Sequence, residues 1–96
     1  MKEIMEKFKN EFKDVYYAYL DASNTLDIME SDHKTYSDND RSVAWDKYKR
    51  KSGQMYELRR VAKILEYPPK DIFSMEDEVI DKYTKDVKGK RLILFK

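Results

Sequence analysis

Apolar residues recur along residues 2–30 at alternating intervals of three and four. The spacing continues without a break through Met5, Phe8, Phe12, Val15, Tyr19, Ala22, Leu26 and Met29. Such heptad spacing is typical of a helix that packs along another helix through one edge. A helix of this length would be about 40 Å long and unstable alone. The pattern therefore predicts a long helix over about 2–30 that has a helical partner.

The same spacing returns over residues 42–66, which are predicted to be that partner. Apolar residues keep the heptad positions at Ala44, Tyr48, Met55, Leu58, Ala62 and Leu65. Lys51 fills the one polar position in the row. An interior glycine destabilises a helix by about 1 kcal/mol relative to Ala, so Gly53 is expected to mark a bend or a close helix crossing. The two segments are predicted to form a long antiparallel helical hairpin.

Polar and proline-containing segments mark the ends of this hairpin. Residues 31–42 are rich in Ser, Asp and Asn, which favours a loop. Helix capping is expected from one of three residues at its end: Asp38, Asp40 or Ser42. Pro68 and Pro69 are expected to end the second helix, because the residue before a proline avoids the helical region.

A short third helix is predicted over about 74–86. Ser74, followed three residues later by Asp77, resembles a capping box that starts it. The helix is expected to bury Met75, Val79, Ile80 and Tyr83. The apolar C-terminal tail at 92–95 is expected to pack along the hairpin or to pair as a strand with another chain. The fold class is therefore all-α, with residues 1–96 forming a single helical domain.

Composition narrows the class of protein further. The chain has two Gly, two Pro and no Cys, which disfavours turn-rich sheets, disulfides and thiolate metal sites. No apolar run approaches a membrane span, and the N-terminus lacks the apolar core of a signal peptide, so a cytoplasmic location is expected. A leftover apolar stripe and the tail favour a homodimer; the stripe comprises Ile4, Tyr16, Leu20 and Ile28.

The charges are unevenly distributed along the chain. Residues 21–40 hold six acids and one Lys, whereas residues 43–63 hold seven bases and two acids. At 100° per residue, basic and aromatic side chains interleave on the second helix along a stripe away from the core. We call it the partner face and define it as Trp45, Lys49, Tyr56, Arg59, Arg60 and Lys63. Alternatively, the two rings pack under the third helix and the tail, and the bases only keep the helix soluble.

Candidate catalytic groups are sparse. His33 follows Glu30 at the spacing of di-iron bundles, but one chain supplies no second motif. Acidic pairs within the first helix and around Glu78 and Asp81 have the chemistry of Mg²⁺ ligands, yet such pairs arise by chance among 19 acids. There is no Gly-rich phosphate loop. We therefore expect no enzyme and no cofactor or metal, with a metal-dependent helical enzyme as a remote alternative.

The function predicted from these patterns is non-enzymatic binding that occludes or sequesters a protein partner through the partner face. The Lys-, Tyr- and Ile-rich composition suggests an accessory protein of a phage or mobile element that inhibits a host defence protein. The main alternative is nucleic-acid binding through the same face, by phosphate contact and base stacking. A small anionic nucleotide bound at an oligomer interface is a variant of that alternative.

Overall fold

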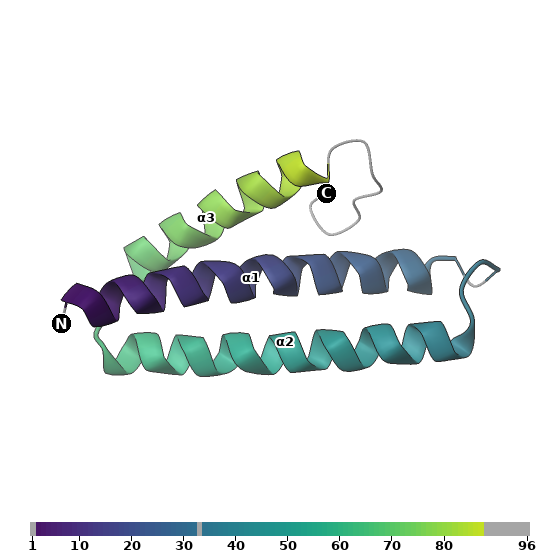
Figure 1. Cartoon of the computed structure of the whole chain (residues 1–96), viewed down its shortest axis with the longest axis horizontal. Coiled ribbons are helices and arrows are strands. Elements are labelled where there is room, and N and C mark those ends of the chain that lie inside the picture. The colour runs from purple at the N-terminus through teal and green to yellow at the C-terminus, as the bar shows by residue number, and fades with distance from the viewer. Residues whose placement is uncertain (1, 33, 88–96) are drawn as a thin grey trace.

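The computed structural model describes residues 2–32 and 34–87, which form three helices and no strand. These are α1 (Lys2–Glu30), α2 (Asp38–Ile64) and α3 (Pro69–Asp86). Helices α1 and α2 run antiparallel, and α3 starts where α2 ends and diverges along another side of α1 (Figure 1). The predicted all-α hairpin with a short third helix is confirmed. His33 and the tail at 92–95 lie outside the described residues.

Helix α2 starts four residues earlier than the predicted boundary at 42. Its N-cap is Ser37, whose hydroxyl accepts a hydrogen bond from the Asp40 amide at 3.1 Å. In return, the Asp40 carboxylate accepts one from the Ser37 amide at 3.1 Å. The prediction of Asp38, Asp40 or Ser42 as the cap was wrong. Asp40 is instead the reciprocal partner in a capping box, which stabilises a start inside the segment read as loop.

The connection between α2 and α3 also differs from the prediction. Helix α2 ends at Ile64, two residues before the predicted end at 66. Glu66 reverses the chain in the left-handed region at φ 56°. The two prolines that follow start α3 at Pro69 rather than merely ending α2, because proline lacks the N–H that a first helical turn leaves unpaired. Ser74 therefore lies inside α3, and the capping box predicted there was wrong.

The core lies on two sides of α1. One side packs on α2, and the other is covered by α3. Leu20 is only 2% exposed and Tyr16 is also buried, both within the core that includes α3. The prediction of a leftover stripe containing these two residues was wrong, because both are buried in the core that the three helices share. Val15 and Tyr19, expected at the centre of the heptad row, are only partly buried.

Hydrogen bonds and an ion pair join α3 to the polar edge of α1. The Tyr83 hydroxyl donates to Asp21 Oδ1 at 3.0 Å, and the Tyr17 hydroxyl donates to Asp86 Oδ2 at 2.7 Å. Lys13 Nζ lies 2.9 Å from Glu78 Oε2. These contacts fix the position of α3 along α1. In residues 2–32 and 34–87, no helix combines the length and apolar character needed to cross a membrane.

The partner face of α2 and its surroundings

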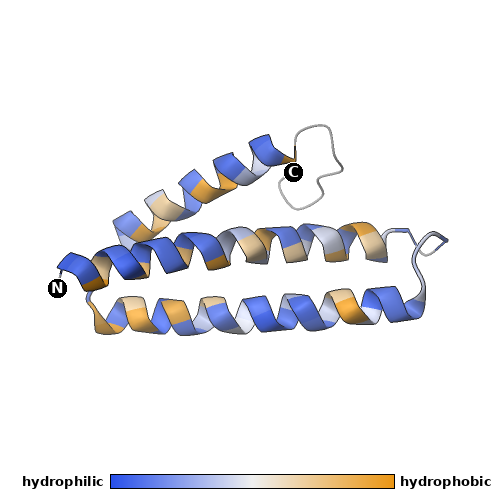
Figure 2. Ribbon diagram, viewed as in Figure 1, coloured by the Kyte–Doolittle hydropathy of each residue, from blue (hydrophilic) through white to orange (hydrophobic). Residues whose placement is uncertain are grey.

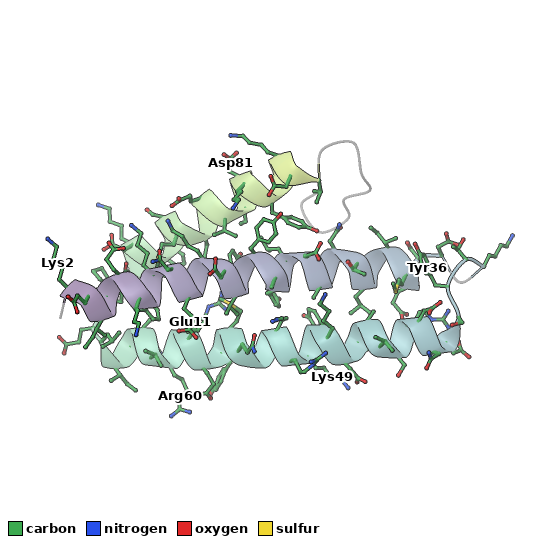
Figure 3. The ribbon with its side chains drawn as sticks, in the orientation of Figure 1. Lys2, Glu11, Tyr36, Lys49, Arg60 and Asp81 are labelled. Atoms are coloured by element: carbon green, nitrogen blue, oxygen red, sulfur yellow. The ribbon has the colours of Figure 1, made fainter. Side chains whose placement is uncertain are left out.

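The partner face runs along α2 from Trp45 to Lys63. All six predicted residues are exposed. Trp45 and Lys63 are 18 positions apart, or about 27 Å along the helix. Lys49 and Arg60 point away from α1 (Figure 3). The structure therefore places the predicted residues on one continuous exposed surface.

The two aromatic residues of this face differ in how firmly they are held. The Trp45 indole N–H donates to Glu30 Oε1 at 3.2 Å, and its ring meets the Tyr48 ring edge-on at 6.0 Å. Tyr56 is 65% exposed and makes no ring contact with the described residues. Neither side chain is buried beneath α3. Trp45 is thus preorganised by the hairpin, whereas Tyr56 presents most of its ring to solvent.

The cations fall into two groups. Arg59 Nη2 lies 2.6 Å from Glu76 Oε2 and so ties α2 to α3. Arg60 Nη1 lies 3.3 Å from Glu57 Oε1 on its own helix. Lys49 and Lys63 have no carboxylate within ion-pair distance among residues 2–32 and 34–87. These two lysines are therefore the cations of the face that remain available to an outside anion.

A pocket of about 330 Å³ opens between the end of α2 and the start of α3. Its lining includes Arg59, Lys63, Tyr67, Ile72, Phe73 and Glu76. Phe73 is 64% exposed at its edge. The sequence analysis did not identify Phe73, because the third helix that it predicts begins one residue later, at Ser74. The signal was present in Pro69, which allows the helix to begin early enough to include Phe73.

The helices around the partner face are acidic. Helix α2 carries eight bases and four acids. By contrast, α1 carries four bases and seven acids, and α3 carries three bases and six acids. Polar residues dominate the middle of α2, and apolar residues gather nearer its two ends (Figure 2). Helix α2 thus combines a basic middle with apolar residues nearer its ends, and the acidic helices beside it limit the reach of its positive field.

A second, larger groove of about 820 Å³ lies between α1 and α2. Its apolar lining includes Ile4, Phe8, Val15, Leu58, Val61 and Leu65. The charged side chains at this groove are two bases, Lys7 and Arg50, and two acids, Glu11 and Glu57. The groove is therefore apolar at its base and mixed in charge around it.

The acidic residues considered as metal ligands do not come together. Glu30 accepts a hydrogen bond from Trp45, Glu78 pairs with Lys13, and Asp81 pairs with Lys85 at 3.0 Å. Since Glu78 lies beside Lys13, it is about 25 Å along α1 from Glu30. Among the residues that the structure describes, no group of three or more His, Asp or Glu side chains is placed to hold a metal ion.

Comparison of the chain with protein-family models, with curated proteins and with solved structures found no match.

Proposed function

We propose that this chain is a non-enzymatic binding protein that occludes or sequesters a protein partner through the partner face. The observation that carries the proposal is the pocket between α2 and α3, where Arg59 and Lys63 of that face meet the exposed ring of Phe73. Aromatic and arginine side chains around an apolar pocket have the composition of protein-interface hot spots.

The chemistry of the pocket indicates the kind of surface it would bind. Ile72 and Phe73 offer apolar contact to one side chain of a partner. Lys63, which has no carboxylate within ion-pair distance among residues 2–32 and 34–87, would pair with an acidic group next to that side chain. We infer an acidic and apolar protein surface as the target. Covering such a surface on an enzyme would inhibit it, as a phage-encoded inhibitor of a host defence protein would do.

The test is quantitative affinity capture from the native host, with cross-linking to map the bound face. Wild type is compared with the double variant Tyr56→Ala, Phe73→Ala and with the control Ile4→Ala, an exposed apolar truncation in the groove between α1 and α2. We expect the double variant to lose the partner and the control to retain it. Retention by the double variant, or cross-links confined to α1, would refute the proposal.

Nucleic-acid binding is the second candidate, supported by Lys49 and Lys63 on either side of Tyr56. Against it, both arginines of the face are paired with glutamates, and α1 and α3 are acidic. It is tested by fluorescence anisotropy with labelled single- and double-stranded oligonucleotides over a salt series. Binding that falls steeply with salt and is lost on reversing Lys49, Arg60 and Lys63 to Glu would support this candidate over a protein partner.

A further inference from the structure

An exposed side of α2, next to the side that packs on α1, carries a second row of residues at heptad spacing. Its members follow one another at intervals of three, four, three, four, three and four: Val43, Asp46, Arg50, Gly53, Glu57, Arg60 and Ile64. All seven are exposed, and the apolar residues at its two ends, Val43 and Ile64, are 59% and 74% exposed. We call this set the far-side row. This spacing places all seven residues on one side of the helix.

Gly53 lies at the centre of the far-side row. A Cβ added to Gly53 would meet no heavy atom within 4 Å, so no close approach inside the chain requires a glycine there. The sequence-based expectation of a close crossing is therefore not met by α1 or α3. An interior helical glycine nevertheless lowers helix stability and allows another backbone to come near. A helix from another molecule crossing α2 at this point would use that space.

The far-side row is complementary to its own antiparallel copy. When two α2 helices cross with a twofold axis close to Gly53, Arg50 of one copy lies opposite Glu57 of the other. The same operation brings Asp46 opposite Arg60, and Val43 opposite Ile64. A twofold interface repeats each of these pairs, because residue i meets j while j meets i. Every charge in the row thus meets the opposite charge, and its two apolar ends meet each other.

We propose that two copies of this chain associate through antiparallel packing of their α2 helices along the far-side row. Charge complementarity selects a second copy as the occupant, because an unrelated helix would have no reason to reproduce this order of charges in reverse. The row also borders the groove between α1 and α2, whose lining includes Arg50, Gly53 and Glu57. The pairing goes beyond the proposed function and leaves Tyr56 and the α2–α3 pocket on another side of the helix, while Arg60 belongs both to the far-side row and to the partner face.

The pairing is tested by reversing the charge of one of the two residues, Arg50 or Glu57, in each variant and then mixing the two variants. In Arg50→Glu, both copies of residue 50 face Glu57, and in Glu57→Arg, both copies of residue 57 face Arg50. In a dimer of either variant, both contacts between positions 50 and 57 therefore join like charges and are repulsive. In a mixture of the two variants, every contact between positions 50 and 57 again joins opposite charges. Both side chains are exposed, and the Glu57–Arg60 ion pair lost in the second variant is a surface pair worth little to the fold.

Sedimentation velocity and native mass spectrometry on the full chain, at concentrations up to about 1 mM, give the readout. We expect wild type to dimerise, each single variant to dimerise about tenfold or more weakly, and the mixture to recover as a heterodimer. The control Lys70→Glu changes an exposed charge on α3 and should dimerise as wild type does. Circular dichroism of each variant alone establishes that it is folded.

A wild-type chain that stays monomeric over this range would overturn the proposal. So would single variants that dimerise as strongly as wild type, since the interface would then lie elsewhere. A mixture in which no heterodimer forms, although both variants are folded, refutes the antiparallel register. Arg50 is outside the partner face, so capture of a protein partner by Arg50→Glu reports separately on the proposed function, whereas Glu57→Arg also removes the ion pair of Arg60.

Discussion

The Tyr83→Phe substitution removes a hydroxyl that joins α3 to α1. Tyr83 is only 1% exposed, and its hydroxyl donates to Asp21 Oδ1 at 3.0 Å. A hydrogen bond to a charged group contributes about 1.5–3 kcal/mol. At neutral pH we therefore expect the substitution to lower the free energy of unfolding by about 2 kcal/mol.

The same hydroxyl makes stability depend on alkaline pH. Burial, together with the hydrogen bond to Asp21, raises the pKa of Tyr83 from 10.0 to about 12. Well below pH 10, folded and unfolded chains both keep this proton, and its contribution to stability is constant. As the pH rises from 10 towards 12, the unfolded chain loses the proton first, so the free energy of unfolding falls. The loss from this one group approaches about 2–3 kcal/mol.

The assay is urea unfolding of wild type and Tyr83→Phe, followed by circular dichroism between about pH 8 and about pH 11.5. The two stability curves should converge as the pH rises, because the variant has no hydroxyl at this position to ionise. Tyr19, whose pKa is raised to about 12 by its hydrogen bond with Tyr48 and by burial, affects both proteins alike. Asp21→Asn, which keeps an acceptor but removes the charge, should give an intermediate slope. Parallel curves for wild type and Tyr83→Phe would refute the buried hydrogen bond.

Three further predictions test the local structure by chemical unfolding. Ser37→Ala should destabilise the fold by about 1 kcal/mol through loss of the cap, with the effect of Asp40→Ala non-additive in a double-mutant cycle; full additivity would argue against a capping box. Gly53→Ala should stabilise the dilute chain by about 1 kcal/mol, since the new methyl group meets no atom, and a loss of stability would contradict the open space around it. Leu20→Ala should lower the free energy of unfolding by about 2–5 kcal/mol and Val15→Ala by clearly less, because Leu20 is buried and Val15 only partly so; the reverse order would contradict this burial.

Local sequence patterns were sufficient for the helices themselves. The unbroken heptad spacing predicted α1 at its observed bounds, because a periodic apolar face and the absence of breakers are properties of the segment alone. The exposure of Trp45 and Tyr56 also followed from angular position on one helix. The starts of α2 and α3 could not be predicted in this way, because a short polar or proline-rich stretch is compatible both with a loop and with a capped first helical turn. The capping contacts of Ser37 determine where α2 begins. The chain reversal at Glu66 places Pro69 at the start of α3.

The tertiary structure alone decided what covers each apolar face. The sequence assigned Tyr16 and Leu20 to a contact with a second copy of the chain, whereas both are buried in the core that α1, α2 and α3 share. The pocket containing Phe73 likewise required the placement of α3 against the end of α2. Hydrophobic burial is non-directional, so a periodic pattern specifies that a face must be covered and leaves the identity of the covering element to the packing of the whole chain.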